Sequence, residues 1–188
     1  MLMTQAELII QLTGTFGKTK VDKLKIILAT QQFSLHDLID LTFHPDQTIA
    51  FRSAWLLENI VLATPLACLN EIDHLLTEFT KVSYPSCQRH YAKMIMHLTA
   101  PKINPLIKEQ LQNKSLELIV EKCFDWMIDP KVLIAVKLFA AEVLFNLRSR
   151  YSWITEELMS QLQFLMKNGS AAIQSRGKKL LVALNATI

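Results

Sequence analysis

The chain has 188 residues, of which 51% are hydrophobic and only 4 are glycine, and its formal net charge is +3. This length suits one domain or one short repeat array, and the composition favours helix over sheet. The basic surplus lies in residues 95–188, which carry 12 basic and 8 acidic side chains against 8 and 9 in residues 1–94. That surplus is a mild polyanion signal and is too small for a strongly basic nucleic-acid domain.

Helical periodicity runs through almost the whole chain, and no sustained strand-like alternation appears. A leading pair of helices is expected near residues 4–12 and 20–31. Ser34 is the expected cap of the next helix. Further helices are predicted, in chain order, near 34–42, 45–62, 66–80, from Pro85 onward, and near 103–112, 115–128, 130–149, 152–167 and after Gly169. The sequence therefore predicts an all-α fold.

The turn between the first two expected helices contains "GTFGKTK", residues 14–20, whose Gly-Lys-Thr resembles the end of a phosphate-binding P-loop. That loop requires a glycine at position 12 and a preceding strand, but Leu12 stands there in a helical pattern. We interpret the segment as an interhelical turn in which Gly14 ends a helix. His36 and His44, farther along, are not at metal-ligand spacing.

Prolines recur at a period near 40 residues. Pro45, Pro85 and Pro130 are predicted to open long helices, because a proline in the first helical turn loses no hydrogen bond. A further step of similar length leads to Gly169, where Asn168 is the expected cap of a last helix. A period of this length indicates a helical repeat.

The repeat register places basic residues at corresponding positions. Seven residues after the anchors stand Arg52, Lys137 and Arg176, whereas Ala92 occupies that place after the second proline. The predicted partner-binding residues, which include basic and aromatic neighbours within one helical turn, are Arg52, Trp55, Arg89, Lys93, Lys137, Arg176 and Lys179.

The segment "DPKVLIAVKLFAAEVLFNL" resembles the second helix of a HEAT-type repeat. Such helices often begin near Asp-Pro and continue with Val-Arg, then Ala-Ala and a spaced leucine. Here Val136-Lys137, Ala140-Ala141 and Leu144 fill those places. The segment "PDQTIAFRSAWLLENI" fits more loosely, with Phe-Arg but Trp-Leu in place of Ala-Ala.

The resemblance implies a right-handed α-α superhelix, a HEAT-like solenoid of about four to five helix pairs. It would form one domain over residues 1–188, with 1–33 as a leading pair and 34–188 as repeats. The implied function is a non-catalytic scaffold that binds a protein or peptide partner along its concave groove, which the second helices line. The apolar ending "LLVALNATI" also predicts either self-association through the terminal helices or a missing partner.

Two alternatives concern the basic residues. Basic and aromatic groups in a groove hold phosphates and stack on bases, and this arrangement is similar to HEAT-like DNA glycosylases of alkylation repair. The runner-up function is therefore nucleic-acid binding. In the structural alternative, each basic residue bonds to an acid or a carbonyl of the adjacent repeat and forms an internal ladder.

No catalytic, cofactor or metal motif stands out, so an enzyme is the less favoured interpretation. His90 and His97 share a helix face with Lys93, which opposes metal binding and indicates a solvated polar face. Glu58 and Glu142 are lone acids on apolar helices, and each is expected to pair with a neighbouring helix.

The expected setting is cytoplasmic. Cys68, Cys87 and Cys123 are widely spaced without a CxxC motif, which predicts buried reduced thiols. The N-terminus carries Glu7 where a signal peptide is apolar. The longest apolar run, residues 132–147, is interrupted by charges and short for a bilayer span, so no membrane contact is predicted.

Overall fold

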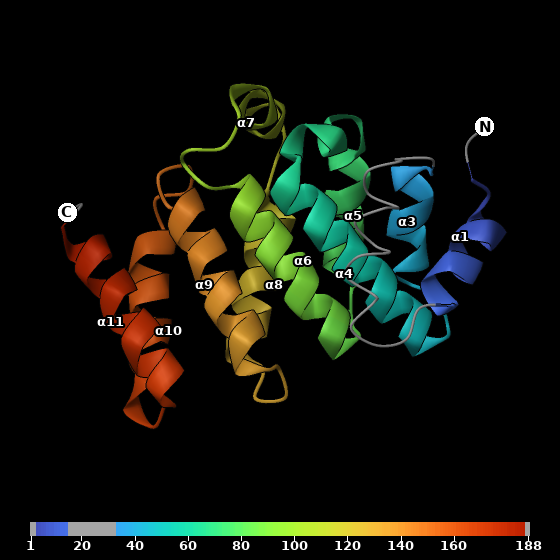
Figure 1. Ribbon diagram of the computed structural model, residues 1–188. Coiled ribbons are helices and arrows are strands. Elements are labelled where there is room, and N and C mark those ends of the chain that lie inside the picture. Colours follow the sequence, from blue (N-terminus) through green and yellow to red (C-terminus); the bar gives the residue numbers. More distant parts are fainter. Residues whose placement is uncertain (1–2, 15–32, 187–188) are drawn as a thin grey trace. The chain divides into compact units, whose positions relative to one another are not determined.

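The structure is a computed structural model that describes residues 3–14 and 33–186 (Figure 1). The described residues form helices and contain no β-sheet, as the all-α prediction requires. An isolated parallel bridge joins Met3 to Phe33. The chain divides into two compact units, Met1–Tyr91 and Ala92–Ile188, and each is described by itself.

The first unit contains short helices around one long central helix. Helix α3 packs on α4 and α5, and α4 also contacts α1 and the 3-10 helix η1. The predicted helix near residues 20–31 lies outside the described residues. The described elements of this unit are α1 (Gln5–Thr13), α3 (Leu35–Leu41), α4 (Gln47–Ala63), η1 (Pro65–Glu71), α5 (Ile72–Lys81) and the first half of α6 (Pro85–Leu98).

Local capping explains where these helices begin and end. Thr4 and Glu7 form a capping box at the start of α1, which satisfies backbone donors that a helix leaves free. Ser34 caps α3, as predicted, and Asp46 caps α4. Gly14 ends α1, also as predicted, because its N–H donates to the carbonyl of Ile10.

The core of the first unit is apolar and includes a buried hydrogen bond between two hydroxyl groups. Leu56, Leu57 and Phe79 are fully buried there. The hydroxyl groups of Thr42 and Tyr91 lie 2.8 Å apart, and burial raises the pKa of Tyr91 above its ordinary value. This hydrogen bond satisfies the phenol inside the core and joins the end of α3 to α6.

The second unit contains helix pairs that follow one another along the chain. Helix α8 packs on α9, which also contacts α10 and α11, and these last two pack on each other. Val136, Ala140 and Leu144 of α9 are fully buried, so α9 is the central helix of this unit. Its elements are the end of α6, α7 (Pro105–Gln112), α8 (Glu117–Ile128), α9 (Ile134–Leu147), α10 (Ile154–Lys167) and α11 (Ala171–Asn185).

The prolines open helices less regularly than the sequence predicts. Pro85 is the first residue of α6, but Pro45 precedes the cap of α4. The prediction for Pro130 is wrong, because α9 begins only at Ile134. The carboxylate of Asp129 accepts the N–H of the residue after Pro130, at 2.8 Å. That side chain closes a turn here, which delays the start of the helix.

Two further boundaries also differ from the prediction. Ser170 caps α11, whereas Asn168 ends α10, since a serine hydroxyl is a strong N-cap acceptor. The helix predicted over residues 66–80 begins as the 3-10 helix η1 and becomes α-helical only at Ile72. Pro65 at the first position of η1 favours a helical start there.

Within residues 3–14 and 33–186, no single helix has both the length and the apolar character needed to cross a membrane. The pair Gln47–Ala63 and Pro65–Lys81, bent by 115°, meets those criteria when the two helices are taken together, by length and composition only.

Candidate functional site

Arg52 on α4 holds the end of α1. Its Nη1 donates to the carbonyl oxygens of Leu12, at 2.6 Å, and Thr13, at 3.1 Å. The last carbonyls of a helix lack partners within the helix, and a cation is favourable at that end. Arg52 therefore stabilises the packing of α1 against α4, which is the kind of contact that the structural alternative predicts.

Lys137 on α9 does the same for α8. It is only 7% exposed, and its Nζ donates to the carbonyl oxygen of Met127 at 2.9 Å. Burial lowers the pKa of Lys137, and the nearby Asp129 opposes that shift. The ammonium group satisfies a carbonyl in the last turn of α8, so Lys137 is part of the helix packing.

Arg176 on α11 completes this register. Its Nε donates to Oε1 of Glu142 on α9 at 2.5 Å. The expected pairing of Glu142 with a neighbouring helix is confirmed. Each basic residue of the register thus bonds to a carbonyl or an acid on an earlier helix.

The other predicted partner-binding residues lie elsewhere on the two units. Arg89 on α6 and Lys179 on α11 are exposed, whereas Trp55 on α4 and Lys93 on α6 are half-buried. Arg89 and Trp55 belong to the first unit, and Lys93 and Lys179 belong to the second. That they contact a partner along one groove stays a prediction.

His90 was predicted to lie on a solvated helix face, and that prediction is wrong, because His90 is buried and only 7% exposed. Its Nδ1 lies 2.6 Å from Oε2 of Glu58, and its ring centroid lies 5.4 Å from that of Phe51. The expected pairing of Glu58 with a neighbouring helix is confirmed. His97, on the same helix, is half-buried, and both burial and the charge of Lys93 lower its pKa.

The second unit contains a cavity of about 630 Å³ that sequence patterns did not indicate. Helix α7, the ends of α6 and α9, and the turns that follow them supply most of its lining. Its apolar lining residues include Leu98, Ile103, Leu111, Leu116, Leu147 and Leu184.

The charged lining of this cavity is entirely basic. Lys108, Arg148 and Arg150 contribute to it, and its lining includes no Asp or Glu. Arg150 donates through Nη1 to the carbonyl oxygen of Leu111 at 2.7 Å and through Nη2 to two further carbonyls after it. Arg150 therefore holds the end of α7 in place, which leaves Lys108 and Arg148 as the candidate ligand contacts.

Arg148 is held by Phe145, yet one of its donors lacks an acceptor. The guanidinium carbon lies 3.8 Å from the Phe145 ring centroid, and Nη1 donates to the Phe145 carbonyl oxygen at 2.6 Å. Among the described residues, the buried Nε of Arg148 has no hydrogen-bond partner. The guanidinium carries a positive charge at the lining of the cavity, so an acidic ligand beside Arg148 would be favourable.

A second, more open hollow in the same unit has the opposite charge. It has a volume of about 520 Å³, and Phe124 and Trp153, with ring centroids 5.5 Å apart, form its apolar part. Its charged lining is entirely acidic and consists of Glu121, Asp125, Glu156 and Glu157.

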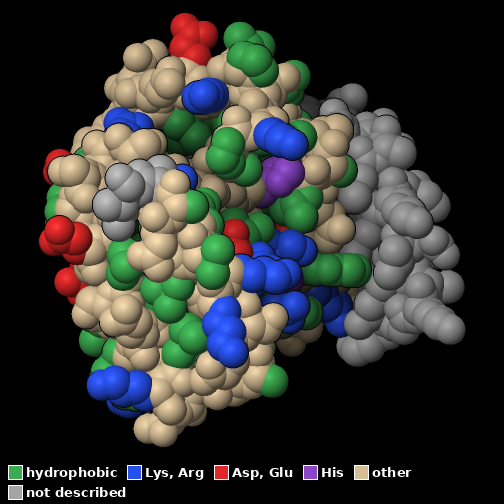
Figure 2. Space-filling view, turned by 90° about the vertical axis from the view of Figure 1, so that its left-hand side faces the viewer, with side chains coloured by type: hydrophobic (Ala, Val, Ile, Leu, Met, Phe, Trp, Pro, Cys, Tyr) green, Lys and Arg blue, Asp and Glu red, His purple; other side chains and the backbone are tan. Residues whose placement is uncertain are grey.

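The C-terminal helices expose apolar side chains. Phe164 on α10 is 68% exposed and Val182 on α11 is 70% exposed. Figure 2 views the molecule from the side on which Figure 1 places these helices, and it shows hydrophobic side chains at the surface among Lys and Arg. Self-association through these helices stays a prediction.

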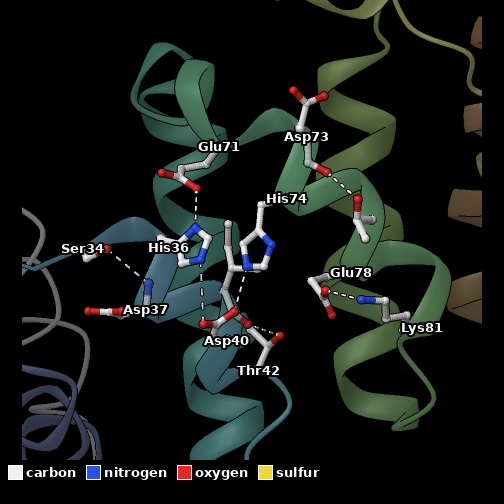
Figure 3. Close-up of polar contacts among 12 residues, drawn as sticks. Ser34, His36, Asp37, Asp40, Thr42, Glu71, Asp73, His74, Glu78 and Lys81 are labelled. Carbon is white, nitrogen blue, oxygen red and sulfur yellow. Dashed lines mark hydrogen bonds and ion pairs between the residues drawn. The ribbon is translucent and has the colours of Figure 1, made fainter.

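A cluster of histidines and carboxylates lies in the first unit (Figure 3). His36 and Asp40 come from α3, Glu71 from the end of η1, and His74 from α5. One donor atom from each of His36, Asp40 and His74 lies within 4.8 Å of the others. The sequence predicted no metal site, because His36 and His74 are 38 positions apart and only the packing of α3 on α5 brings them together.

A family model described as a HEAT repeat domain matches residues 9–184. Neither the curated proteins nor the solved structures contain a significant match to the chain.

Proposed function

The chain belongs to the HEAT repeat domain family, and we propose that it is a non-catalytic scaffold that binds an acidic segment of a partner protein. The match confirms the predicted all-α helical-repeat class, and such repeats commonly mediate protein interactions. The observation that carries the proposal is the cavity of the second unit, which combines an apolar lining with basic residues only.

The chemistry of the cavity favours an acidic segment with an apolar side chain. Transfer of an apolar side chain from water to a lining of leucines lowers the free energy and therefore favours binding. A neighbouring carboxylate would pair with the positive charges of Lys108 and Arg148, which both line the cavity. The cavity lies within the 300–1,000 Å³ range usual for ligand pockets.

The nucleic-acid alternative has less support. Its register residues Arg52, Lys137 and Arg176 already donate to protein oxygens, so a phosphate contact would have to replace those bonds. The net charge of +3 also supplies little long-range attraction to a polyanion.

The cysteines support a non-catalytic interpretation. Burial raises the pKa of Cys68 and of Cys87 to about 12, and it also raises the pKa of Cys123. All three are buried and unpaired, as predicted. A thiol held protonated is a poor nucleophile. Free thiols also fit the reducing cytoplasmic setting that we propose.

Fluorescence anisotropy with short labelled peptides tests the proposal. The probes share their leucine content and differ only in whether aspartate, serine or lysine alternates with the leucines. We expect the chain to bind the aspartate peptide most tightly, and added salt to weaken this binding because the contacts are between opposite charges. A preference for the lysine peptide would contradict the proposal and would favour the acidic hollow.

Variants locate the binding. Lys108→Glu and Arg148→Gln should each weaken binding of the aspartate peptide by at least about tenfold, as expected for lost charge contacts in an interface. Lys131→Glu is the matched control, because Lys131 is exposed in the same unit and does not line the cavity. Lys131→Glu changes the net charge as much as Lys108→Glu does, so equal weakening by these two variants would show attraction to the net charge alone. A DNA duplex bound more tightly than the peptide at low salt would favour the nucleic-acid alternative.

A further inference from the structure

We propose that His36, His74 and Asp40 bind one Zn²⁺ ion, with Glu71 orienting His36 (Figure 3). Two imidazoles and one carboxylate are a donor set that zinc sites use, and they leave a fourth position for water or an outside ligand. The proposed site is independent of the cavity in the second unit, since all four residues belong to Met1–Tyr91.

The hydrogen bonds of His36 fix the nitrogen that faces the ion. Its Nδ1 lies 3.0 Å from Oε2 of Glu71. An ionised carboxylate only accepts hydrogen bonds, so Nδ1 carries the proton and neutral His36 keeps a lone pair on Nε2. That Nε2 faces Oδ2 of Asp40 at 4.0 Å, which is too long for a hydrogen bond. Metal-binding histidines commonly donate their other N–H to a carboxylate in this way.

The present distances are close to those a zinc ion requires. Ligand atoms at about 2 Å from tetrahedral zinc lie about 3.3 Å from one another. The Nε2 of His74 lies 2.7 Å from Oδ1 of Asp40, and the ion would take the place of the proton between them. One ligand atom from each of the three residues already lies within 4.8 Å of the others, so each distance must change by about 1.5 Å at most.

The two imidazole rings are stacked, and we expect Zn²⁺ binding to separate them. The centroids of His36 and His74 lie 4.0 Å apart with an interplanar angle of 13°. Two imidazoles on one tetrahedral zinc have centroids about 5 Å apart, so binding must separate the stacked rings. The side chain of His36 is 52% exposed, which leaves it room to turn.

The donor atoms also select the class of ion. Imidazole with carboxylate suits zinc and its transition-metal neighbours, whereas magnesium and calcium prefer oxygen ligands alone.

Competing sites are few in this sequence, because His44, His90 and His97 are its remaining histidines. The three cysteines are buried. Asp40 and His74 are both accessible from solvent, so the ion has an entry path.

Isothermal titration calorimetry of the metal-free full chain with Zn²⁺ tests the site. We expect one Zn²⁺ per chain, and no comparable binding of Mg²⁺. His74→Ala and Asp40→Asn should each weaken Zn²⁺ binding by at least about tenfold. Loss of a residue that only orients a ligand already costs that much, and a residue that binds the ion directly matters at least as much. Glu71→Gln should weaken it less. His44→Ala is the matched control and should bind Zn²⁺ as the parent does.

Co²⁺ provides a second readout that does not depend on heat. A bound Co²⁺ with three protein ligands should give visible absorption bands, and these should disappear in His36→Ala/His74→Ala while circular dichroism confirms that the variant is folded. Absence of Zn²⁺ binding at about 1 mM would overturn the proposal. Unchanged binding by the folded double variant would overturn it as well, because the ion would then lie elsewhere.

Discussion

The two compact units stabilise their charged side chains in different ways. In Met1–Tyr91, the acids of three elements pair with histidines, and these pairs are His36–Glu71, His74–Asp40 and His90–Glu58. In Ala92–Ile188, Lys137 and Arg150 instead donate to backbone carbonyls at helix ends. A histidine can lose its proton near neutral pH, and its ring nitrogen can then bind a metal ion. Lysine and arginine instead keep their charge at physiological pH.

Arg52 shows that the division is not absolute. It lies in the first unit and uses the carbonyl contact that is typical of the second. The comparison therefore separates two kinds of contact, and variants of each kind should differ in the size of their effect.

The largest effect is expected from the buried histidine–acid pair. Glu58→Ala removes the partner of His90, whose side chain is 8% exposed, and should lower the free energy of unfolding by about 3 kcal/mol. Glu142→Ala is the matched control, because its partner Arg176 is 45% exposed and the loss should stay below about 1 kcal/mol. Urea denaturation measures both. Equal losses would remove the distinction between the two pairs.

A smaller effect is expected from the buried lysine. Lys137→Met retains the volume of the side chain but leaves the carbonyl of Met127 without its donor, so the free energy of unfolding should fall by about 1–2 kcal/mol. Thermal denaturation followed by circular dichroism measures the change. A variant more stable than the parent would show that burying the ammonium costs more than its hydrogen bond contributes.

Arg52→Ala should act locally. Loss of its bonds to Leu12 and Thr13 should cost about 1 kcal/mol and speed hydrogen exchange in α1. Exposed Arg89→Ala is the control and should leave exchange in α1 unchanged. Unchanged exchange in both variants would contradict a structural role for Arg52 and favour its prediction as a partner contact.

The smallest effect concerns pH. Burial and Lys93 lower the pKa of His97, so the folded chain resists its protonation. The resulting stability is present above the ordinary histidine pKa of about 6.5 and is lost as the pH falls below it. His97→Gln should therefore reduce the loss of stability between neutral and mildly acidic pH, as thermal denaturation at each pH would show. A steeper loss of stability in the variant would contradict the inference that folding lowers the pKa of His97.

Local signals in the sequence were enough to predict most of the helices that the structure describes. The pattern of apolar residues gave α3, α8 and α10 to within about two residues, because these helices bury one continuous face. Boundaries failed where a side chain closed a turn, as Asp129 does before α9. Such a turn depends on one hydrogen bond and leaves little periodic signal.

The sites were harder to predict, because they depend on contacts distant in sequence. His36 meets His74 only when α3 packs on α5, and no spacing along the chain marks that pair. The cavity combines Lys108 of α7 with Arg148 at the end of α9. The sequence placed Arg52, Lys137 and Arg176 at corresponding positions, yet a count of positions could not distinguish a groove contact from the carbonyl contact of Arg52.

Hydrogen exchange of the full chain, with and without the aspartate–leucine peptide, tests the central claim most directly. Peptide binding at the cavity should slow exchange in residues 98–116 and 146–155, which supply most of its lining. The segment 45–62, which carries Arg52 and Trp55, should exchange as before. Slower exchange confined to residues 45–62 would contradict the account and would favour the predicted groove contacts of Arg52 and Trp55.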